Sequence, residues 1–413
     1  MLSTAAFAVL TGCQGTAESA PALKVWAMGK EAEYLFQTVD GQRVAGHRVE
    51  VQRIPWSAAH EKLLTAYVAG TLPDVIQLGS TWIPEFVAVG ALACQNEAKA
   101  ELVRDFFPGA IESSRSGGAW CATPWYVDTR VLFYRRDLLT RAGFADPPRT
   151  WEEWRQAMAR IRELGPDHYG LLAPLDEWQL LVALAFQAGA DLLREHDTRG
   201  NFRSAAFRRA LSFYVSLFHD GFAPFQGPAQ VANVYQDFAA GLFTFYVTGP
   251  WNLGEFRRRL PPGLQEHWAT AVLPTPELGR PSVSVMGGAS LAITKSCTKP
   301  EAAQQVIDFL LSTDEQVRLH RATGDLPARR SAWKLLGGND AERLLAFRLQ
   351  LEHARSTPPI PEWERIAGLL VRYTELVVRG HLTIDTALTQ LDEETDRVLA
   401  KRRWLLQRSA TAP

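Results

Sequence analysis

The chain has 413 residues, of which 46% are hydrophobic and 22% are charged, and its formal net charge is -1. This composition predicts a soluble globular protein that is long enough to build two lobes with separate cores. Because 44 basic side chains are balanced by 45 acidic ones, no general field would attract nucleic acid or an anionic membrane. The 13 tryptophans exceed the usual need of a core, so some indole rings are candidates for a ligand surface.

The first 22 residues are expected to form a secretion signal and a tether. Residues 2–10 are a short apolar run, which suits a signal and is too short to span a bilayer as a helix. The run ends in Leu10-Thr11-Gly12-Cys13, which resembles a bacterial lipobox, whose cysteine is lipidated and becomes the first mature residue. We therefore expect a lipid on Cys13 to hold the protein on the periplasmic or cell-surface side of the inner membrane. The alternative is a cysteine that merely follows a small residue.

Three cysteines remain after Cys13. In an oxidising compartment Cys94 and Cys121 are expected to pair, because each lies in a turn-like segment that flanks the same loop. Cys297 lies among polar residues and is expected to be a free surface thiol. No cysteine and histidine grouping has metal-ligand spacing, so neither a metal nor another cofactor is expected.

Short apolar strands alternate with amphipathic helices, which favours an α/β architecture with largely parallel sheets. Strands are predicted at residues 23–28, 49–54, 74–78, 131–134, 243–247, 271–273 and 290–293. Helices are predicted at residues 60–69, 179–188, 207–219, 300–311, 341–353, 366–378 and 384–400.

A further helix is predicted to begin at the capping box formed by Thr150 and Glu153. Its apolar stripe includes Trp151 and Trp154. These two tryptophans are therefore assigned to the core and removed from the candidate ligand surface.

Several short motifs follow one another along the chain. They include Leu-Pro-Asp-Val-Ile at 72–76, Asp-Thr-Arg-Val-Leu-Phe-Tyr at 128–134 and Thr-Gly-Asp-Leu-Pro-Ala-Arg at 323–329, with further motifs at 82–92, 142–153, 241–251, 287–293 and 300–303. In this order and spacing the chain resembles the family 1 extracellular solute-binding proteins, the group that includes maltose-type binding proteins. The resemblance covers nearly the whole chain after the signal.

The resemblance implies the two-lobe periplasmic-binding-protein fold, in which discontinuous α/β lobes are joined by a three-segment hinge and close on a ligand. The crossings are expected near Asp128, 271–274 and 324–327. The N-terminal lobe is then expected to comprise 23–128 and 275–325, and the C-terminal lobe 129–274 and 326–408.

The resemblance also implies a sugar in the cleft. A sugar offers hydroxyls to polar side chains and C–H faces to aromatic rings, and α/β folds place ligands at strand-to-helix loops. Lys30 and Glu31 follow the first predicted strand and are candidates, unless they form a solvated pair. Ser80 and Thr81 follow another strand and are candidates, unless they cap the next helix.

The segment around the first crossing is rich in suitable side chains. Tyr126, Asp128 and Arg130 lie there, and the carboxylate and guanidinium could bond hydroxyls or could simply pair and stiffen the hinge. Trp178, preceded by Asp176, opens a predicted helix where the family commonly has a stacking aromatic. All five are expected to contact the ligand.

The remaining candidates come from the second half of the chain. Trp251 follows a strand that ends in Gly-Pro, so its ring is expected to stack on the sugar. Gly287 and Gly288 leave amides uncovered for close approach. Arg329, at the third crossing, often reaches the sugar in this family, and Trp363 completes the set.

The resemblance favours capture of a disaccharide such as maltose or trehalose and delivery to the permease subunits of an ABC importer, by a monomer without enzymatic activity. Residues 366–370 lack the aromatic pair found in maltose-type members, so a long malto-oligosaccharide is less well supported. One rival is an extracellular carbohydrate-active enzyme with two catalytic carboxylates, although no familiar catalytic motif is present. The other is a binding protein for a polyol, a glycerophosphodiester or a peptide.

Overall fold

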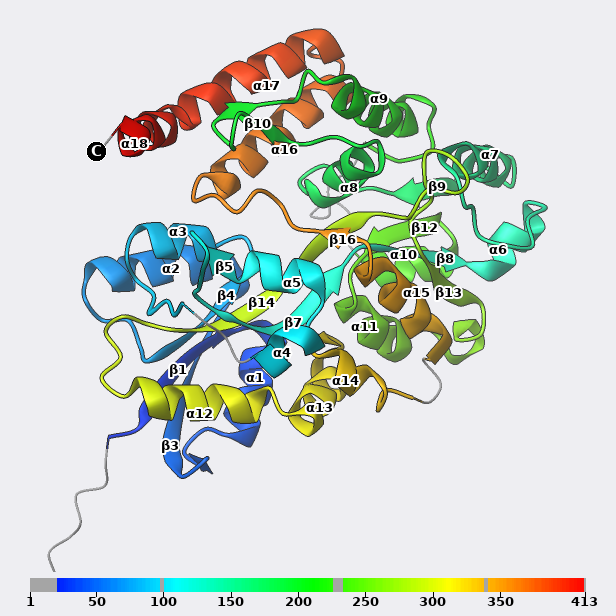
Figure 1. The fold of residues 1–413 in the computed structure, drawn as a ribbon. Helices are drawn as coiled ribbons and strands as arrows, with labels where there is room; N and C mark the ends of the chain where they lie inside the picture. The colour runs from blue at the N-terminus through cyan, green and yellow to red at the C-terminus, as the bar shows by residue number, and fades with distance from the viewer. Residues whose placement is uncertain (1–20, 97–99, 226–232, 338–340, 412–413) are drawn as a thin grey trace, which may run out of the picture.

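The computed structural model describes residues 21–96, 100–225, 233–337 and 341–411. The described chain forms two α/β lobes, each built around its own sheet (Figure 1). In that view the lobe with the larger sheet lies at the lower left and the lobe with the smaller sheet at the upper right. Cys13 and the rest of the expected signal lie outside the described residues.

The larger sheet has 8 strands, in the order β15-β7-β14-β4-β1-β3-β2 with β16 paired to β14. Its strands are β1 (Leu23–Met28), β2 (Arg43–Val44), β3 (His47–Ile54), β4 (Val75–Gly79), β7 (Thr123–Thr129), β14 (Ser284–Ile293), β15 (Leu326–Pro327) and β16 (Ala354–Arg355). The helices of this part of the chain are α1 (Gly29–Thr38), α2 (Trp56–Val68), α3 (Ile83–Ala88), α4 (Ala100–Asp105), α5 (Pro108–Ser113), α12 (Pro300–Leu310), α13 (Thr313–Thr323) and α14 (Arg330–Trp333).

The smaller sheet has 4 strands, in the order β13-β8-β12-β9. They are β8 (Val131–Arg135), β9 (Tyr169–Leu172), β12 (Phe243–Thr248) and β13 (Trp268–Ala271). The helices with this sheet are α6 (Arg136–Arg141), α7 (Trp151–Arg162), α8 (Gln179–Gln187), α9 (Ala205–His219), α10 (Val234–Ala240), α11 (Trp251–Arg259), α15 (Ala341–Leu351), α16 (Trp363–Val378), α17 (Ile384–Val398) and α18 (Ala400–Thr411). Two hairpins complete the fold, β5 (Arg115–Ser116) with β6 (Ala119–Trp120) and β10 (Leu193–Arg194) with β11 (Arg199–Gly200).

Both sheets are mixed, so the expectation of largely parallel sheets is wrong. β1 is parallel to β3 and β4, but β14 is antiparallel to β4 and β7. In the smaller sheet β12 is parallel to β9 and antiparallel to β8. A βαβ crossover enforces parallel pairing, whereas β14 enters its sheet from the other lobe and is free to run in the opposite direction.

The strand pairing shows which residues belong to each sheet around the three expected crossings. The first crossing is direct, because β7 ends at Thr129 and β8 begins at Val131. In the second, Thr275 still bridges to Thr150, and the larger sheet is joined only at Ser284. In the third, β15 at 326–327 still pairs with β7. Pairing with the larger sheet therefore continues to residue 327, beyond the expected boundary at 325, and β16 pairs with β14 of the same sheet further along the chain.

One predicted strand is displaced by three residues. The apolar segment 271–273 was expected to be extended, but β13 spans Trp268–Ala271. Trp268 is buried and stacks on Phe133, with the ring centroids 5.9 Å apart. The N–H of Leu273 donates to the side chain of Gln350 instead of to a strand. Burial of the large indole thus decides the register.

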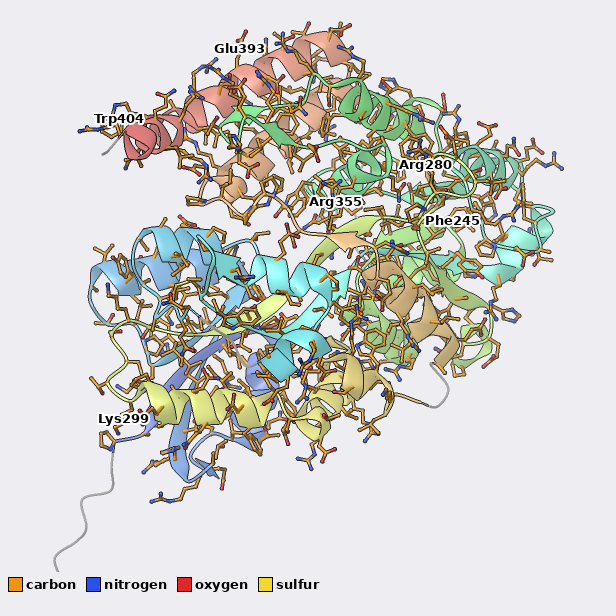
Figure 2. All side chains as sticks on the ribbon, viewed as in Figure 1. Phe245, Arg280, Lys299, Arg355, Glu393 and Trp404 are labelled. Atoms are coloured by element: carbon orange, nitrogen blue, oxygen red, sulfur yellow. A yellow bond between two sulfur atoms is a disulfide. The ribbon has the colours of Figure 1, made fainter. Side chains whose placement is uncertain are left out.

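The capping box and the core tryptophans are confirmed. The hydroxyl oxygen of Thr150 accepts a hydrogen bond from the N–H of Glu153 at 3.1 Å. Thr150 is the N-cap of α7, which begins at Trp151. Trp154 is 0% exposed and packs edge-on against Phe245 of β12. Figure 2 shows Phe245 inside this lobe, surrounded by other side chains, whereas Trp404 lies on the outside of the molecule, on α18.

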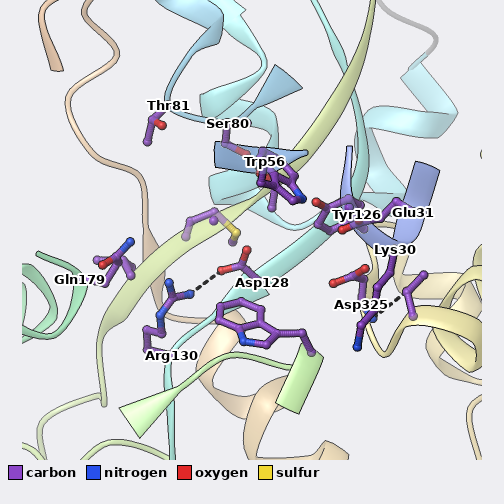
Figure 3. A pocket seen from close by; sticks show the side chains of 18 of the residues that line it. Lys30, Glu31, Trp56, Ser80, Thr81, Tyr126, Asp128, Arg130, Gln179 and Asp325 are labelled. Carbon is purple, nitrogen blue, oxygen red and sulfur yellow. Dashed lines mark hydrogen bonds and ion pairs between the residues drawn. The ribbon is translucent and has the colours of Figure 1, made fainter. Parts of the chain in front are cut away.

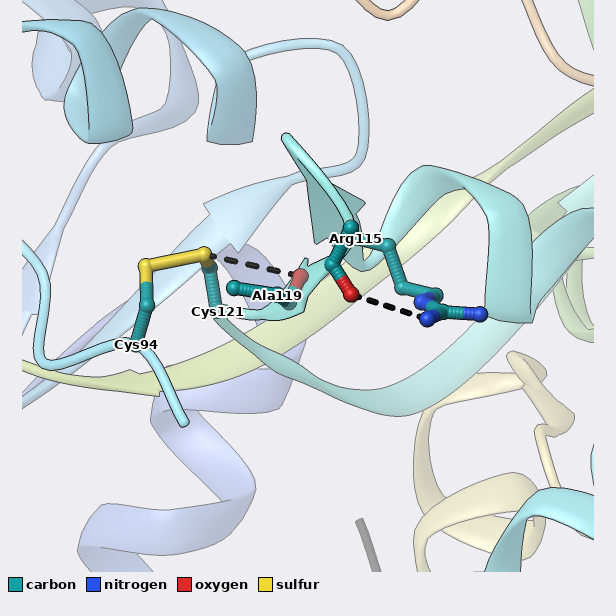
Figure 4. Close-up of a disulfide and its surroundings, with 5 residues drawn as sticks. Cys94, Arg115, Ala119 and Cys121 are labelled. Atoms are coloured by element: carbon teal, nitrogen blue, oxygen red, sulfur yellow. Dashed lines mark hydrogen bonds between the residues drawn. A yellow bond between two sulfur atoms is a disulfide. The ribbon is translucent and has the colours of Figure 1, made fainter. Parts of the chain in front are cut away.

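Cys94 and Cys121 form a disulfide in the structure, with an S–S distance of 2.09 Å (Figure 4). The adjacent residues Gln95 and Trp120 exchange two backbone hydrogen bonds, so the two segments lie side by side independently of the sulfurs. Cys297 is half-buried against the core of the larger-sheet lobe, and burial raises the pKa of its thiol to about 11. Cys297 is therefore a free thiol, as expected, but it is half-buried and not fully at the surface.

The disulfide closes a loop of 27 residues, and cross-linking a loop of that length removes about 3 to 4 kcal/mol of chain entropy from the unfolded state. The double variant Cys94→Ser/Cys121→Ser is expected to lose stability of that order in urea unfolding. Alkylation of the unreduced, denatured protein should modify neither cysteine. Cys297→Ser is the control. Equal unfolding midpoints for the parent and the double variant would contradict this prediction.

Within the described parts of the chain, no helix combines the length and apolar character needed to cross a membrane. The same residues contain no group of three or more His, Cys, Asp or Glu side chains arranged to hold a metal ion.

Candidate ligand-binding site

A cavity of about 710 Å³ lies between the two lobes, and residues of both lobes line it. Most of the candidates from the sequence are brought together here. Those that line the cavity are Lys30, Glu31, Ser80, Thr81, Tyr126, Asp128, Arg130, Trp178, Trp251, Gly287 and Gly288. They come from the ends of β1, β4, β7 and β12, from the segment before α8, and from the middle of β14.

Three candidates lie outside the cavity, and each has a structural reason. Asp176 is exposed, because the chain turns there before α8 and presents Trp178 and Gln179 to the cavity instead. Trp363 is 0% exposed in the core of the smaller-sheet lobe, where its ring meets that of Trp178 edge-on at 5.3 Å. It supports a cavity residue without reaching the cavity.

Arg329 is the third candidate that the structure removes from the cavity. Its Nε donates to Asp105 Oδ2 at 2.7 Å, and its Nη1 donates to the carbonyl of Leu311 at 3.1 Å. The guanidinium therefore ties α14 to α4 and to the end of α12 on the far side of the third crossing.

Arg329→Ala is accordingly expected to reduce stability and to leave ligand affinity almost unchanged. Loss of a charged hydrogen-bond partner from Asp105, whose side chain is 18% exposed, should cost about 1 to 3 kcal/mol. Thermal unfolding and titration calorimetry on the same preparation measure the two quantities. A tenfold loss of affinity at unchanged melting temperature would contradict this placement.

Four tryptophans line the cavity, namely Trp56, Trp82, Trp178 and Trp251. The rings of Trp56 and Trp82 meet edge-on at 5.5 Å, and the guanidinium of Arg130 lies 4.7 Å from the ring centre of Trp251. Trp56 and Trp82 were not among the candidates. Their positions shortly after β3 and β4, at the carboxyl ends of parallel strands, were the available signal.

The two glycines of β14 allow two strands to approach closely. A Cβ on Gly287 would lie 2.4 Å from Asp128 Oδ1, and one on Gly288, whose φ is +112°, would lie 2.3 Å from the carbonyl of Tyr126. Only glycine fits at either position. The carboxylate of Asp128 therefore rests against the backbone of β14, as Figure 3 shows from the cavity side.

Asp128 and Arg130 form an ion pair, with Asp128 Oδ1 and Arg130 Nη1 2.9 Å apart (Figure 3). Burial raises the pKa of Asp128, and the neighbouring Arg130 opposes that rise. Both side chains line the cavity and are mostly buried, with 16% and 10% exposed. The pair thus stiffens the first crossing and also presents polar atoms to the cavity. The two interpretations of this pair, as a hinge brace and as a partner for ligand hydroxyls, are therefore compatible.

Lys30 and Glu255 form an ion pair across the cavity, from α1 in one lobe to α11 in the other. Burial alone would raise the pKa of Glu255, but hydrogen bonds from Lys30 and Arg258 outweigh it and lower the pKa to about 2. Glu31 is 5% exposed and Lys30 pairs with Glu255, so Lys30 and Glu31 are not a solvated pair. The N-cap position of α3 is Trp82, with no side-chain cap, so Ser80 and Thr81 do not cap that helix.

Other cavity residues were missed in the sequence. They include Gln179, Tyr235, Glu255, Arg259 and Asp325, together with Trp56 and Trp82. Most of them lie in the interior or at the start of helices, where a sequence pattern assigns polar residues to solvent. Asp325 belongs to the Gly-Asp-Leu-Pro segment, so the expected third crossing was the signal that could have found it.

The chain is similar to several known proteins. The family model of the bacterial extracellular solute-binding proteins matches residues 33–317. The solved structure of the sugar-binding protein MalE from Xanthomonas citri is 43% identical and superimposes with a TM-score of 0.85, over 94% of this chain and 99% of that one. The GacH receptor of Streptomyces glaucescens is 22% identical with a TM-score of 0.79, over 92% of this chain and 98% of its own.

A relative known from sequence extends the comparison. The diacetylchitobiose binding protein DasA of Streptomyces coelicolor is 24% identical, over 92% of this chain and 90% of its own length. The superpositions confirm the expected two-lobe α/β fold. The chain belongs to the bacterial extracellular solute-binding proteins.

Proposed function

We propose that the protein is the extracytoplasmic sugar-binding subunit of an ABC importer, and that its two lobes close on an oligosaccharide in the cavity between them. A disaccharide of glucose, such as maltose or trehalose, is the favoured ligand. The observation that carries this proposal is the combination of four indole rings with Asp128, Arg130 and Glu31 around one cavity.

The chemistry of that lining supports a sugar. Indole faces accept the C–H faces of a pyranose, and fixed carboxylate and guanidinium groups bond its hydroxyls in defined directions. A cavity of about 710 Å³ falls within the range of small-molecule sites and has room for more than a monosaccharide. A bound phosphate would need uncommitted cations, whereas Lys30 and Arg130 are each paired with a carboxylate.

The names of similar proteins point to the same class of ligand. They include the sugar-binding protein MalE of Xanthomonas citri, the diacetylchitobiose binding protein of Streptomyces coelicolor and a maltooligosaccharide ABC transporter solute-binding lipoprotein of Streptococcus pneumoniae. We also propose that the protein delivers its sugar to the permease subunits of the importer. It is proposed to be a monomer that is lipid-anchored through Cys13 on the outer side of the inner membrane.

The test is a thermal-shift screen against glucose, maltose, trehalose, maltotriose and diacetylchitobiose, followed by titration calorimetry of each sugar that raises the melting temperature. A ligand present at 100 times its Kd stabilises the folded state by about 2.7 kcal/mol, which the screen detects readily. Maltose or trehalose should bind most tightly. Glycerophosphodiesters and a short peptide serve as controls, and a shift with one of these alone would replace the sugar proposal.

The same samples test the rival reading as an enzyme. After prolonged incubation each oligosaccharide should be recovered intact, which chromatography of the mixture measures. Release of glucose from maltose or trehalose, abolished by Asp128→Asn, would establish a glycosidase instead.

A further inference from the structure

Two buried carboxyl groups, those of Glu31 and Asp325, lie next to each other on the wall of the cavity (Figure 3). Each residue is 5% exposed, and the two side chains are in hydrogen-bond contact. Within the described residues, neither forms an ion pair with a lysine or arginine, in contrast to Asp128 and Glu255. Two ionised carboxylates cannot share so close a buried contact, so one of the two holds a proton.

The hydrogen bonds behind Glu31 decide which of the two accepts. The N–H of Met28 donates to Gln77 Oε1 at 2.7 Å, which orients the amide so that Gln77 Nε2 donates to Tyr126 Oη at 3.3 Å. With that oxygen accepting from Gln77, the hydroxyl proton of Tyr126 is left for its hydrogen bond to Glu31. Glu31 is therefore a hydrogen-bond acceptor on this side.

The surroundings of Asp325 favour the protonated form. Glu31 faces it from α1, Tyr126 and Asp128 face it from β7, and Thr323 and His320 lie beside it at the end of α13. Burial, followed by the negative charge of Glu31, raises the pKa of Asp325 well above its usual value. His320 contacts the backbone carbonyl of Asp325 through Nδ1 at 2.9 Å.

Glu31 also has an oxygen near the cavity surface. A Cβ on Gly29, whose φ is +66°, would lie 2.5 Å from Glu31 Oε2 and 2.6 Å from Trp56 Nε1. Only a glycine at this position lets the carboxylate and the indole both approach the backbone. Gly29, Glu31 and Trp56 all line the cavity.

We propose that Asp325 is a positioning residue, whose protonated carboxyl group donates a hydrogen bond to Glu31, so that Glu31 is fixed as a hydroxyl acceptor for the bound sugar. This inference rests on the proposed function only for the identity of the ligand. Removing the proton at high pH places two carboxylates in contact and pushes Glu31 out of position. Sugar affinity should then fall as the pH rises.

The same proton affects stability without any sugar. Because the pKa of Asp325 is raised in the folded protein, the folded state binds more protons than the unfolded state above about pH 4, the usual range for aspartate. The stability that the protonated Asp325 contributes is complete below that pH and is lost as the pH rises through the folded pKa. Asp325→Asn, which cannot ionise, should therefore lose less stability than the parent as the pH rises. The melting temperature of the variant minus that of the parent should then increase with pH.

The experiment compares the parent with Asp325→Asn and Asp325→Ala, using calorimetry with maltose over a pH series from about pH 4, the usual range for aspartate, to about pH 9. The parent should lose at least about tenfold in maltose affinity over this range. Asp325→Ala should bind at least about tenfold more weakly at pH 6, and Asp325→Asn, which keeps a donor, should restore most of that loss and show a flat pH profile. Asp105→Asn, a carboxyl outside the cavity, is the matched control and should follow the parent.

Two outcomes would overturn the inference. One is an Asp325→Asn variant whose maltose affinity varies with pH as the parent's does. The other is melting curves of the sugar-free parent and Asp325→Asn that respond identically to pH. If maltose does not bind the parent at any pH, the ligand assignment fails, and the melting curves alone still decide the role of Asp325.

Discussion

Trp154→Ala is expected to lower the free energy of unfolding by about 3 to 5 kcal/mol, the usual cost of removing a fully buried indole and leaving a cavity. Trp154 is 0% exposed, and its ring lies 6.2 Å from that of Phe245 and 6.3 Å from that of Phe213. Its contacts are all within the smaller-sheet lobe, away from the cavity. Sugar affinity should therefore change little as long as the variant is folded.

Urea unfolding followed by circular dichroism measures this loss, and titration calorimetry at low temperature measures the affinity of the folded fraction. Trp404→Ala is a suitable control, because its ring is 52% exposed and its loss should change stability by less than about 0.5 kcal/mol. A Trp154→Ala variant that unfolds like the parent would show that the lobe does not depend on this packing.

Trp251→Ala should have the opposite profile, with sugar affinity reduced at least about tenfold, or about 1.4 kcal/mol, and stability nearly preserved. A micromolar site needs about 8 kcal/mol of net binding free energy, and hydroxyl hydrogen bonds supply little of it because water already satisfies them. Ring burial should supply most of the rest. Trp251 begins α11, lines the cavity, and is held from one side by the guanidinium of Arg130.

Trp178→Ala should behave like Trp251→Ala, because its ring lines the cavity and is supported from behind by Trp363. Trp363→Ala serves as the matched core variant, for which stability should fall strongly. Calorimetry and thermal unfolding are measured on all three. If Trp251→Ala binds maltose like the parent but melts far lower, Trp251 is a core residue and the sugar does not lie against it.

Asp128 shows how far local sequence could go. Its position in the motif at 128–134, two residues before Arg130, placed both residues near an expected crossing, and the structure puts their ion pair in the cavity wall where β7 is followed by β8. Gly287 and Gly288 were expected to let a ligand approach their amides; both line the cavity, and the segment that approaches them in the structure is β7. Strand ends and glycine pairs constrain the backbone locally, which is why the sequence could place these residues at the cavity, whereas their contact with a ligand stays a prediction.

The sequence by itself therefore determined the α/β class, the capping box and core stripe of α7, and the group of segments that supply the cavity. Only the tertiary structure decided which side chains of those segments face it. Trp363 and Trp178 are both aromatic residues at helix starts, yet packing buries Trp363 behind Trp178. Arg329 bonds Asp105, and Asp325 lies against Glu31. These partners are 224 and 294 positions away along the chain, so no local pattern could pair them. A side chain's direction depends on contacts of that range, and a local pattern does not contain them.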